Sequence, residues 1–197
     1  MLLGDKMFTG IIEDVGEVKN LFGNKIVISS ELMVSDVKLG DSICVNGVCL
    51  TVISFDEKTF SVEAVPETLR KSNLGNLEIK SLLNLERSMP PTGRFGGHFV
   101  QGHIDAVGIV DSIEPDGSAE MIHFQVTDPV LKYIVEKGFV CVDGTSLTVV
   151  DCTHDGFSIT LIPHTKANTK FRDLKVGDTV NLESDIVAKY VEKLFEK

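Results

Sequence analysis

Two short segments of the sequence carry a thiol or a hydroxyl group beside a threonine, at a spacing that suits ligand binding. Side chains alternate along a strand, so the first and third residues of each segment point to the same side of a sheet. Groups of this kind can hydrogen-bond a polar heterocycle in a shallow cleft, although they also form ladders that only stabilise a sheet surface. The two segments are Cys49-Leu50-Thr51 and Ser146-Leu147-Thr148.

Two further segments interrupt a strand with a proline and then offer polar groups. Peptide groups at such a break lack ladder partners and are free to bond a ligand, whereas an ordinary strand-ending turn is the alternative. Lys137 is one of few basic residues near these motifs, and it could also be a solvated surface lysine. The two segments are Glu63-Ala64-Val65-Pro66-Glu67-Thr68 and Leu161-Ile162-Pro163-His164-Thr165-Lys166.

The sequence contains two copies of one structural unit, and each copy carries one set of these residues. DSICVNGVCLTV at 41–52 matches GFVCVDGTSLTV at 138–149, with an offset of 97 and identity at six of twelve positions. The same offset aligns Leu83-Asn84-Leu85-Glu86 with Val180-Asn181-Leu182-Glu183. Two tandem copies of about 90 residues are too few for a solenoid, so each copy should close its own core.

Equivalent glycines occur where the first strand of each copy begins. Upstream the offset becomes 92 and aligns Gly10 with Gly102. A glycine there lets a ligand or another backbone approach closely, or it marks a bulge or a barrel corner. His98 and His103 lie near the second glycine, but residues five apart on a strand point to opposite faces. We therefore expect no metal site there.

Each copy has the pattern of a small closed barrel. Short β-branched runs alternate with polar residues between Gly, Asn and Asp. Asn46-Gly47 and Asp143-Gly144 predict type I′ hairpin turns, which need positive φ at both central residues. About six short strands per copy without a long helix favour a barrel over a parallel sheet. Short helical turns are expected at 67–73 and 130–136.

The C-terminal tail has a different pattern. Apolar residues recur at helical spacing over 185–197, and Ser184 or Asp185 can cap the start of the helix. The apolar stripe must be buried either on its own barrel or against the same helix of other subunits. The pattern leaves both possibilities open.

Composition excludes several classes of protein. The chain has 197 residues with a formal net charge of −10, which disfavours binding to nucleic acid or to an anionic membrane surface. No apolar run approaches the about 20 residues of a spanning helix, and the first residues do not have the pattern of a signal peptide. Four cysteines without C-x-x-C spacing predict free thiols in a cytoplasmic protein. Common nucleotide-binding, hydrolase and metalloprotease motifs are absent, which leaves an enzyme acting on paired copies of one ligand or a carrier.

Seven ordered motifs, which cover nearly all of the chain from residue 7, resemble the riboflavin synthase family. They lie at 7–11, 46–52, 66–70, 83–87, 96–105, 137–149 and 177–183. The resemblance implies an all-β fold of two tandem six-stranded Greek-key barrels from an internal duplication, plus a C-terminal α-helix. It implies an N-terminal barrel at 1–95, a C-terminal barrel at 96–184 and a trimerisation helix at 185–197.

The resemblance also implies the reaction. Two molecules of 6,7-dimethyl-8-ribityllumazine dismutate by transfer of a four-carbon unit, giving riboflavin and 5-amino-6-(ribitylamino)pyrimidinedione without a cofactor or metal. This is the final step of riboflavin biosynthesis, and the site lies between the N-barrel of one subunit and the C-barrel of its neighbour. A non-catalytic lumazine-binding carrier is the rival. Such proteins tend to lack the site residues in one barrel, whereas both copies keep them here.

Site residues follow from the same resemblance. In the N-barrel the implied ligand contacts are Gly10, Ile11, Ile12, Cys49, Leu50, Thr51 and residues 63–68. In the C-barrel they are Gly102, His103, Ile104, Lys137, Ser146, Leu147, Thr148 and residues 161–166. The candidates for roles near the chemistry are Phe8, Cys49, His103, Ser146, Thr148 and Asp185. Which of them moves a proton is open, and Asp185 has helix capping as an alternative role.

Overall fold

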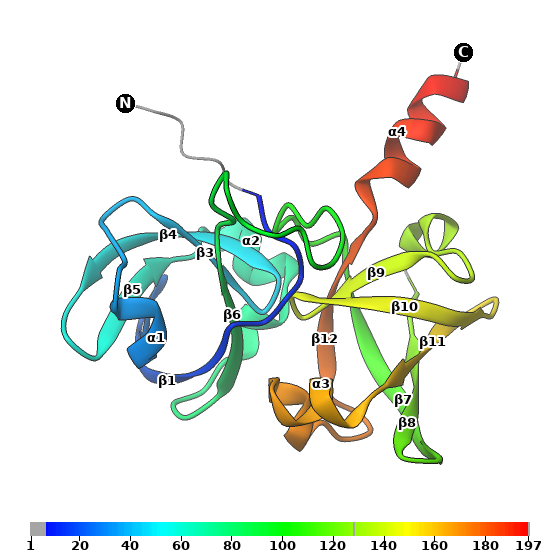
Figure 1. The fold of residues 1–197 in the computed structure, drawn as a ribbon, viewed down its shortest axis with the longest axis horizontal. Helices are drawn as coiled ribbons and strands as arrows, with labels where there is room; N and C mark the ends of the chain where they lie inside the picture. Colours follow the sequence, from blue (N-terminus) through cyan, green and yellow to red (C-terminus); the bar gives the residue numbers. More distant parts are fainter. Residues whose placement is uncertain (1–6, 128, 197) are drawn as a thin grey trace.

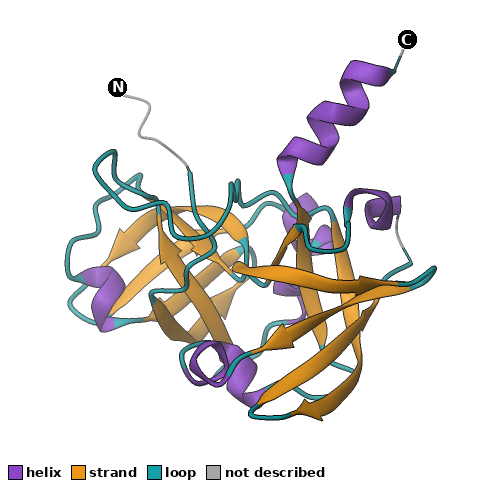
Figure 2. Cartoon of the chain, turned by 45° about the vertical axis from the view of Figure 1, so that its right-hand side comes forward, coloured by secondary structure: helices purple, strands orange, loops and turns teal. Residues whose placement is uncertain are grey.

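Two closed β-barrels lie side by side, and a helix extends from the second barrel (Figures 1 and 2). The structure, a computed structural model, describes residues 7–127 and 129–196. The strand order is β1-β2-β5-β4-β3-β6 in barrel 1 and, read from its own first strand, β7-β8-β11-β10-β9-β12 in barrel 2. Both orders are of the Greek-key type. The predicted fold class is therefore confirmed.

Short strands and single helical turns make up each barrel. Barrel 1 contains β1 (Asp14–Phe22), β2 (Lys25–Ser29), α1 (Glu31–Val34), β3 (Ser42–Val45), β4 (Val48–Phe55), β5 (Thr59–Glu63), α2 (Pro66–Lys71), η1 (Asn73–Asn76) and β6 (Leu82–Arg87). Barrel 2 contains β7 (Ala106–Asp116), β8 (Ala119–Gln125), η2 (Pro129–Tyr133), β9 (Phe139–Val142), β10 (Thr145–Cys152), β11 (Gly156–Leu161), α3 (Pro163–Ala167), η3 (Lys170–Asp173) and β12 (Thr179–Ser184).

Helical turns follow the two strand-ending prolines. The turns expected at 67–73 and 130–136 correspond to α2 with η1 and to η2. Pro163, which the sequence marked only as a strand break, begins α3 in the same way that Pro66 begins α2. Proline suits the first helical turn because its fixed φ is already helical and its missing N–H would have no helical partner.

The tips of the two predicted hairpins meet where the barrels touch. Asn46 and Gly47 have φ of 45° and 82°, and Asp143 and Gly144 have φ of 43° and 81°. These values confirm the predicted turns with positive φ at both central positions. A Cβ atom on Gly47 would lie 2.9 Å from the Gly144 backbone nitrogen, so the close approach also requires glycine.

The segment that precedes each barrel lies against the other barrel. We call residues 7–13 the N-terminal arm and residues 97–105 the linker arm. The arms run antiparallel, with Phe8 N donating to Val100 O at 2.9 Å and Val100 N donating to Phe8 O at 3.1 Å. Phe8 and Val100 are fully buried and form a small core between the barrels with Cys44 and Cys141. Each barrel has a larger hydrophobic core of its own.

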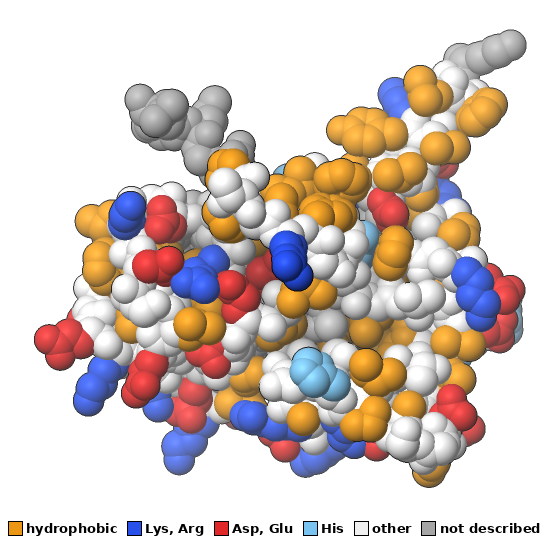
Figure 3. Space-filling view, viewed as in Figure 1, with side chains coloured by type: hydrophobic (Ala, Val, Ile, Leu, Met, Phe, Trp, Pro, Cys, Tyr) orange, Lys and Arg blue, Asp and Glu red, His pale blue; other side chains and the backbone are white. Residues whose placement is uncertain are grey.

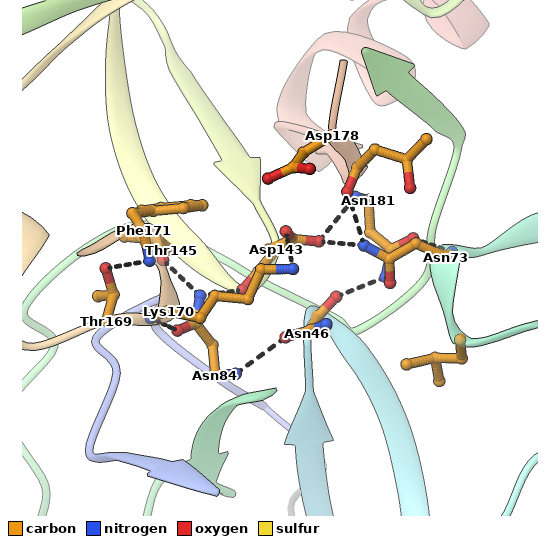
Figure 4. Close-up of polar contacts among 12 residues, drawn as sticks. Asn46, Asn73, Asn84, Asp143, Thr145, Thr169, Lys170, Phe171, Asp178 and Asn181 are labelled. Atoms are coloured by element: carbon orange, nitrogen blue, oxygen red, sulfur yellow. Dashed lines mark hydrogen bonds and ion pairs between the residues drawn. The ribbon is translucent and has the colours of Figure 1, made fainter. Parts of the chain in front are cut away.

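A buried polar network also joins the two barrels (Figure 4). Asp143 is completely buried, and its carboxylate accepts hydrogen bonds from Asn73 Nδ2 at 2.9 Å and from the Asn181 backbone N–H at 2.8 Å. Lys170 Nζ lies 2.7 Å from its second oxygen. Asn84 donates to the Asp143 carbonyl at 2.9 Å. Because every partner comes from a different element, the network fixes the barrels relative to each other.

The final helix α4 (Ile186–Phe195) projects from barrel 2 (Figures 1 and 2). Asp185 caps it by accepting a hydrogen bond from the Val187 N–H at 3.0 Å, while Ser184 is bonded to Asp105 instead. No residue of the helix is buried within the chain. Figure 3 shows hydrophobic side chains gathered along the helix and over the adjoining face. The exposed ones on α4 are Val187, Tyr190, Val191, Leu194 and Phe195.

Candidate active site

The arms cross over, so each candidate site combines residues of both barrels. Cys49 N on β4 donates to Gly102 O of the linker arm at 2.9 Å. Ser146 N on β10 donates to Gly10 O of the N-terminal arm at 2.7 Å. The family resemblance grouped Gly10 with Cys49 and Gly102 with Ser146 as ligand contacts of the same barrel. The backbone contacts in the structure instead join Gly102 to Cys49 and Gly10 to Ser146.

Glycine is required at both crossings. Gly10 and Gly102 have φ of 76° and 80°. A Cβ atom on Gly10 would lie 2.7 Å from the Ser146 Cβ, and one on Gly102 would lie 2.5 Å from the Cys49 Cβ. The glycines therefore serve the close backbone approach that the sequence allowed for.

Site 1 is a cavity of about 450 Å³ where the linker arm crosses barrel 1. Cys49 supplies a thiol, Thr68 a hydroxyl at the start of α2, and His103 an imidazole from the arm. Ile104 packs on the core of barrel 1 and closes one wall. The remaining lining residues are Val48, Glu67, Lys71, Ser72, Gly102 and Asp105. Site 1 thus brings together predicted residues from three separate segments.

Site 2 is the equivalent place on barrel 2, around Ser146. His98 Nδ1 lies 2.7 Å from Ser146 Oγ, and the His98 ring stacks on Phe139 with centroids 5.2 Å apart. Gly97 leaves room for this approach, since a Cβ atom there would lie 2.8 Å from the Ser146 Cβ. Burial lowers the pKa of His98, and the negative charge of Asp185 opposes that shift. A neutral imidazole on a serine hydroxyl is a general-base arrangement.

The predicted alternation of the two tripeptides is confirmed. Thr51 and Thr148 are exposed and Cys49 and Ser146 are partly exposed, on the outer faces of β4 and β10. The residues between them point the opposite way, into the barrels.

Several predicted contact residues lie where their side chains do not face a cleft. Leu50 and Ala64 belong to the core of barrel 1, and Leu147 and Leu161 belong to the core of barrel 2. Side chains alternate along a strand, so only every second residue of a predicted run can face a cleft on the outer surface. The residues between them point into the core. Phe8 is fully buried in the core between the barrels, which gives it a packing role.

The other predicted residues lie around the rims of the two sites or farther out. In the strand-end segments, Glu63, Val65, Pro66 and Glu67 are exposed in barrel 1, as are Ile162, Pro163 and His164 in barrel 2. Ile11 is exposed and Ile12 partly exposed on the N-terminal arm, and Thr165 is partly exposed on α3. Lys166 Nζ pairs with Glu120 at 2.5 Å, and Lys137 is exposed with its amine 3.4 Å from Val150 O.

The sequence-based set of site residues missed three side chains. His98 was weighed as a metal ligand and counted among the residues that distinguish an enzyme from a carrier, but it was given no contact or catalytic role, although its neighbour Gly97 was a signal for close approach. Glu86 and Glu183 bind the backbone of the two arms, and the conserved spacing of the repeated blocks at 83–86 and 180–183 was the available signal. Burial raises the pKa of each of these glutamates to about 7.

A second cavity of about 550 Å³ lies between the N-terminal arm, β3, β6 and the loop that follows β6. Arg87 lines it and is bonded to Glu13 at 2.9 Å and to Asp36 at 2.8 Å. Within residues 7–127 and 129–196, no three His, Cys, Asp or Glu side chains come together as a metal site. In the same described ranges no helix is long and apolar enough to cross a membrane.

Comparison with known proteins assigns both barrels to one domain family. The lumazine binding domain family matches residues 9–88 and 101–185. Solved structures of LumP have the same fold: the complex with 6,7-dimethyl-8-(1'-D-ribityl) lumazine has a TM-score of 0.82 at 21% identity, covering 90% of this chain and 99% of that chain. The riboflavin complex of LumP gives 0.83 at 22% identity, with the same coverage. The chain is thus a tandem lumazine-binding-domain protein.

Relatives with higher sequence identity show the family within this class of proteins. The chain is 44% identical to the riboflavin synthase of Actinobacillus pleuropneumoniae, over 97% of this chain and 91% of the relative. It is 40% identical to that of Bacillus subtilis with the same coverage, and 44% identical to that of Schizosaccharomyces pombe over 96% of this chain and 94% of the relative. The chain belongs to the riboflavin synthase family.

Proposed function

We propose that this protein is a riboflavin synthase. It joins two molecules of 6,7-dimethyl-8-ribityllumazine by moving a four-carbon unit from one to the other, which gives riboflavin and 5-amino-6-(ribitylamino)pyrimidinedione. The observation that carries this proposal is 40–44% identity to riboflavin synthases over nearly the whole chain, with both barrels matching the lumazine binding domain family.

The duplicated fold suits a reaction between two identical molecules. One substrate occupies site 1, beside Cys49 and His103, and the other occupies a copy of site 2, beside Ser146 and His98. Holding two reactants in contact removes much of the entropic barrier to a bimolecular step. The C7 methyl group of the substrate is acidic, so a modest base is enough to begin the reaction.

Site 2 has the better geometry for moving that proton. The neutral His98 imidazole can take a proton from Ser146 Oγ at 2.7 Å, and the hydroxyl oxygen can then take one from the substrate. Burial lowers the pKa of His98, and the negative charge of Asp185 opposes this shift and so favours the imidazolium that forms. Cys49 and His103 hold the second substrate in site 1 and offer groups that can return a proton.

Three chains assemble around α4 in this proposal. The helix is not covered by its own barrels, and side chains such as Val187 (52% exposed) and Leu194 (83% exposed) lie on its surface. Ile11, Phe95, Phe99 and Phe139 extend the exposed apolar surface next to site 2. Contact through these surfaces brings site 2 of one chain against site 1 of its neighbour. We place the protein in the cytoplasm, in keeping with the free thiols of Cys44, Cys141 and Cys152.

A single assay tests the enzymatic function. Purified protein incubated with 6,7-dimethyl-8-ribityllumazine alone should develop the absorbance of riboflavin, and the rate should scale with enzyme concentration. The control is the variant Ser146→Ala, which keeps the fold and removes the proposed proton carrier. Tight binding of the lumazine without riboflavin formation would identify a carrier and contradict the proposal.

A further inference from the structure

Glu183 is a buried carboxylate on β12 of barrel 2, and the proposed chemistry does not use it. Glu183 is 1% exposed, and both of its carboxylate oxygens accept hydrogen bonds from the linker arm. Oε1 accepts the Gln101 N–H at 2.7 Å, and Oε2 accepts the N–H groups of Gly102 and His103, both at 2.9 Å. Three consecutive backbone donors on one carboxylate fix the path of the arm at that point.

The fixed part of the arm belongs to site 1, on the other barrel. The Gly102 carbonyl accepts the Cys49 N–H at 2.9 Å, and His103 and Ile104 line the cavity. The contacts therefore run from Glu183 in barrel 2 through the backbone of Gly102 to Cys49 in barrel 1. A change at Glu183 reaches site 1 through a single peptide segment.

Glu86 on β6 makes the reciprocal arrangement. It is 4% exposed and accepts the Thr9 N–H at 2.7 Å, the Thr9 hydroxyl at 3.0 Å and the Gly10 N–H at 3.0 Å. The Gly10 carbonyl accepts the Ser146 N–H at 2.7 Å, and the Thr9 carbonyl accepts the His98 N–H at 3.1 Å. Glu86 thus reaches Ser146 and His98 of site 2 from barrel 1.

We propose that Glu183 is a positioning residue for site 1 and that Glu86 is a positioning residue for site 2, so that each barrel organises the ligand site of the other. The inference rests on the proposed function, because that function makes the two sites the places where lumazines and riboflavin bind. Neither glutamate contacts the ligand directly. Each acts through the two or three arm residues that its carboxylate binds.

A carboxylate is needed in this role because all its partners are donors. At pH 8, above the pKa of about 7 that burial gives Glu183, the carboxylate is ionised and only accepts hydrogen bonds. A glutamine would place an NH₂ group where the second oxygen accepted an N–H. The substitution Glu→Gln keeps the size of the side chain while it replaces one acceptor with a donor. The arm should then shift away from its site. The hydrogen bonds that are lost are charge-assisted, which makes them stronger than bonds between neutral groups.

Protection of Cys49 by riboflavin measures site 1 by itself. Catalysis needs both sites, so a loss of turnover in either variant does not locate the damage. We therefore use alkylation of Cys49 by iodoacetamide at pH 8, followed by peptide mass spectrometry, in the full-length protein with increasing riboflavin. The exposed Cys152 in the same chain is the internal control for reagent activity.

The expected result separates the two glutamates. Glu183→Gln raises the riboflavin concentration that gives half protection of Cys49 about tenfold, the effect of losing one charge-assisted hydrogen bond. Glu86→Gln, the matched control at the equivalent position of the repeat, leaves this concentration within about twofold of wild type. Equal shifts in both variants, or no shift in Glu183→Gln, would overturn the inference.

A second pair of variants covers the case in which a glutamine variant does not fold. Gly102→Ala leaves Glu183 intact and displaces the same arm, because the added Cβ would lie 2.5 Å from the Cys49 Cβ. It should weaken protection of Cys49, whereas Gly10→Ala should not. The opposite ranking would also overturn the inference.

The proposed function can fail separately from this inference. If wild-type protein forms no riboflavin from the lumazine and riboflavin does not protect Cys49, the function itself is wrong and the inference falls with it. If wild type forms riboflavin and shows protection while Glu183→Gln behaves like wild type, only the positioning role is wrong.

Discussion

Single side chains at the two sites differ in ways that the repeat alone conceals. Cys49 and Ser146 are equivalent in sequence, yet one side chain is a thiol and the other a hydroxyl, with His98 Nδ1 2.7 Å from the hydroxyl oxygen. The His98 ring is held there by the Phe139 ring and by the absence of a side chain at Gly97. In the proposed function both copies bind the same type of ligand, and the His98–Ser146 pair belongs to site 2.

Removing the Ser146 hydroxyl tests the role of this pair. We predict that Ser146→Ala lowers kcat about 10²-fold, the lower end of what a positioned acid–base group contributes. KM should change much less, because the backbone contact to Gly10 remains. Thr153→Ala, beyond the far end of β10, is the control and should keep wild-type kcat. Equal kcat for Ser146→Ala and wild type in steady-state assays would rule out the pair as the proton carrier.

The buried glutamates predict a pH dependence of stability. Their pKa is raised by burial to about 7, whereas glutamate in an unfolded chain has a pKa of about 4.3. The folded state thus favours the protonated form, so its stabilisation is fully present below pH about 4 and is lost as pH rises through 7. The difference in unfolding free energy between wild type and the double variant Glu86→Gln/Glu183→Gln should decrease from pH 5 to pH 8.

Chemical denaturation at several pH values measures this difference. Burial raises the pKa of the Cys44 and Cys141 thiols well above its ordinary value, so neither ionises between pH 5 and pH 8. Burial lowers the pKa of His98, which is present in both proteins, so its contribution largely cancels. A difference that stays constant from pH 5 to pH 8 would mean that the glutamates ionise at ordinary pKa values in the folded protein.

At the scale of elements, the hairpin turns were predictable and the crossing of the arms was not. Asn46-Gly47 and Asp143-Gly144 specify positive φ locally, so four residues are enough to place each turn. The arms hold their positions through contacts with residues about 80 positions away, such as Thr9 with Glu86. Local periodicity contains no information on such pairings, and the repeat shows only that both arms behave alike.

The polar network between the barrels gives a prediction at this scale. Asp143→Ala should lower the unfolding free energy by about 3–5 kcal/mol, because it leaves the half-buried Lys170 charge without its buried partner. The control is Lys166→Ala, which removes a more exposed pair with Glu120 and should cost at most about 1 kcal/mol. Urea denaturation measures both. Similar values for the two variants would show that the network does not stabilise the junction.

For the whole molecule, the duplication in the sequence was enough to predict two barrels and a site in each. It did not show that the site of each barrel is completed by the arm of the other. Alternation predicted that Leu50 and Leu147 point away from their neighbours Cys49 and Ser146, and both lie in the cores. His98 could not be assigned to Ser146, because 48 residues separate them in the chain.

Removing residues 186–197 tests the proposed assembly. The apolar side chains of α4 are not covered by their own chain, so their loss should leave the barrels folded and abolish the association of subunits. We expect a monomer in sedimentation velocity, near-native circular dichroism and little activity. A sedimentation coefficient unchanged apart from the lost mass would place the subunit contact elsewhere.

A riboflavin synthase joins two identical substrates. The most direct measurement is the stoichiometry of a quenched reaction that starts from 6,7-dimethyl-8-ribityllumazine alone and is analysed by liquid chromatography. We expect one riboflavin and one 5-amino-6-(ribitylamino)pyrimidinedione for every two lumazines consumed. Lumazine that is bound but not consumed, or riboflavin formed without an equal amount of the pyrimidinedione, would contradict it.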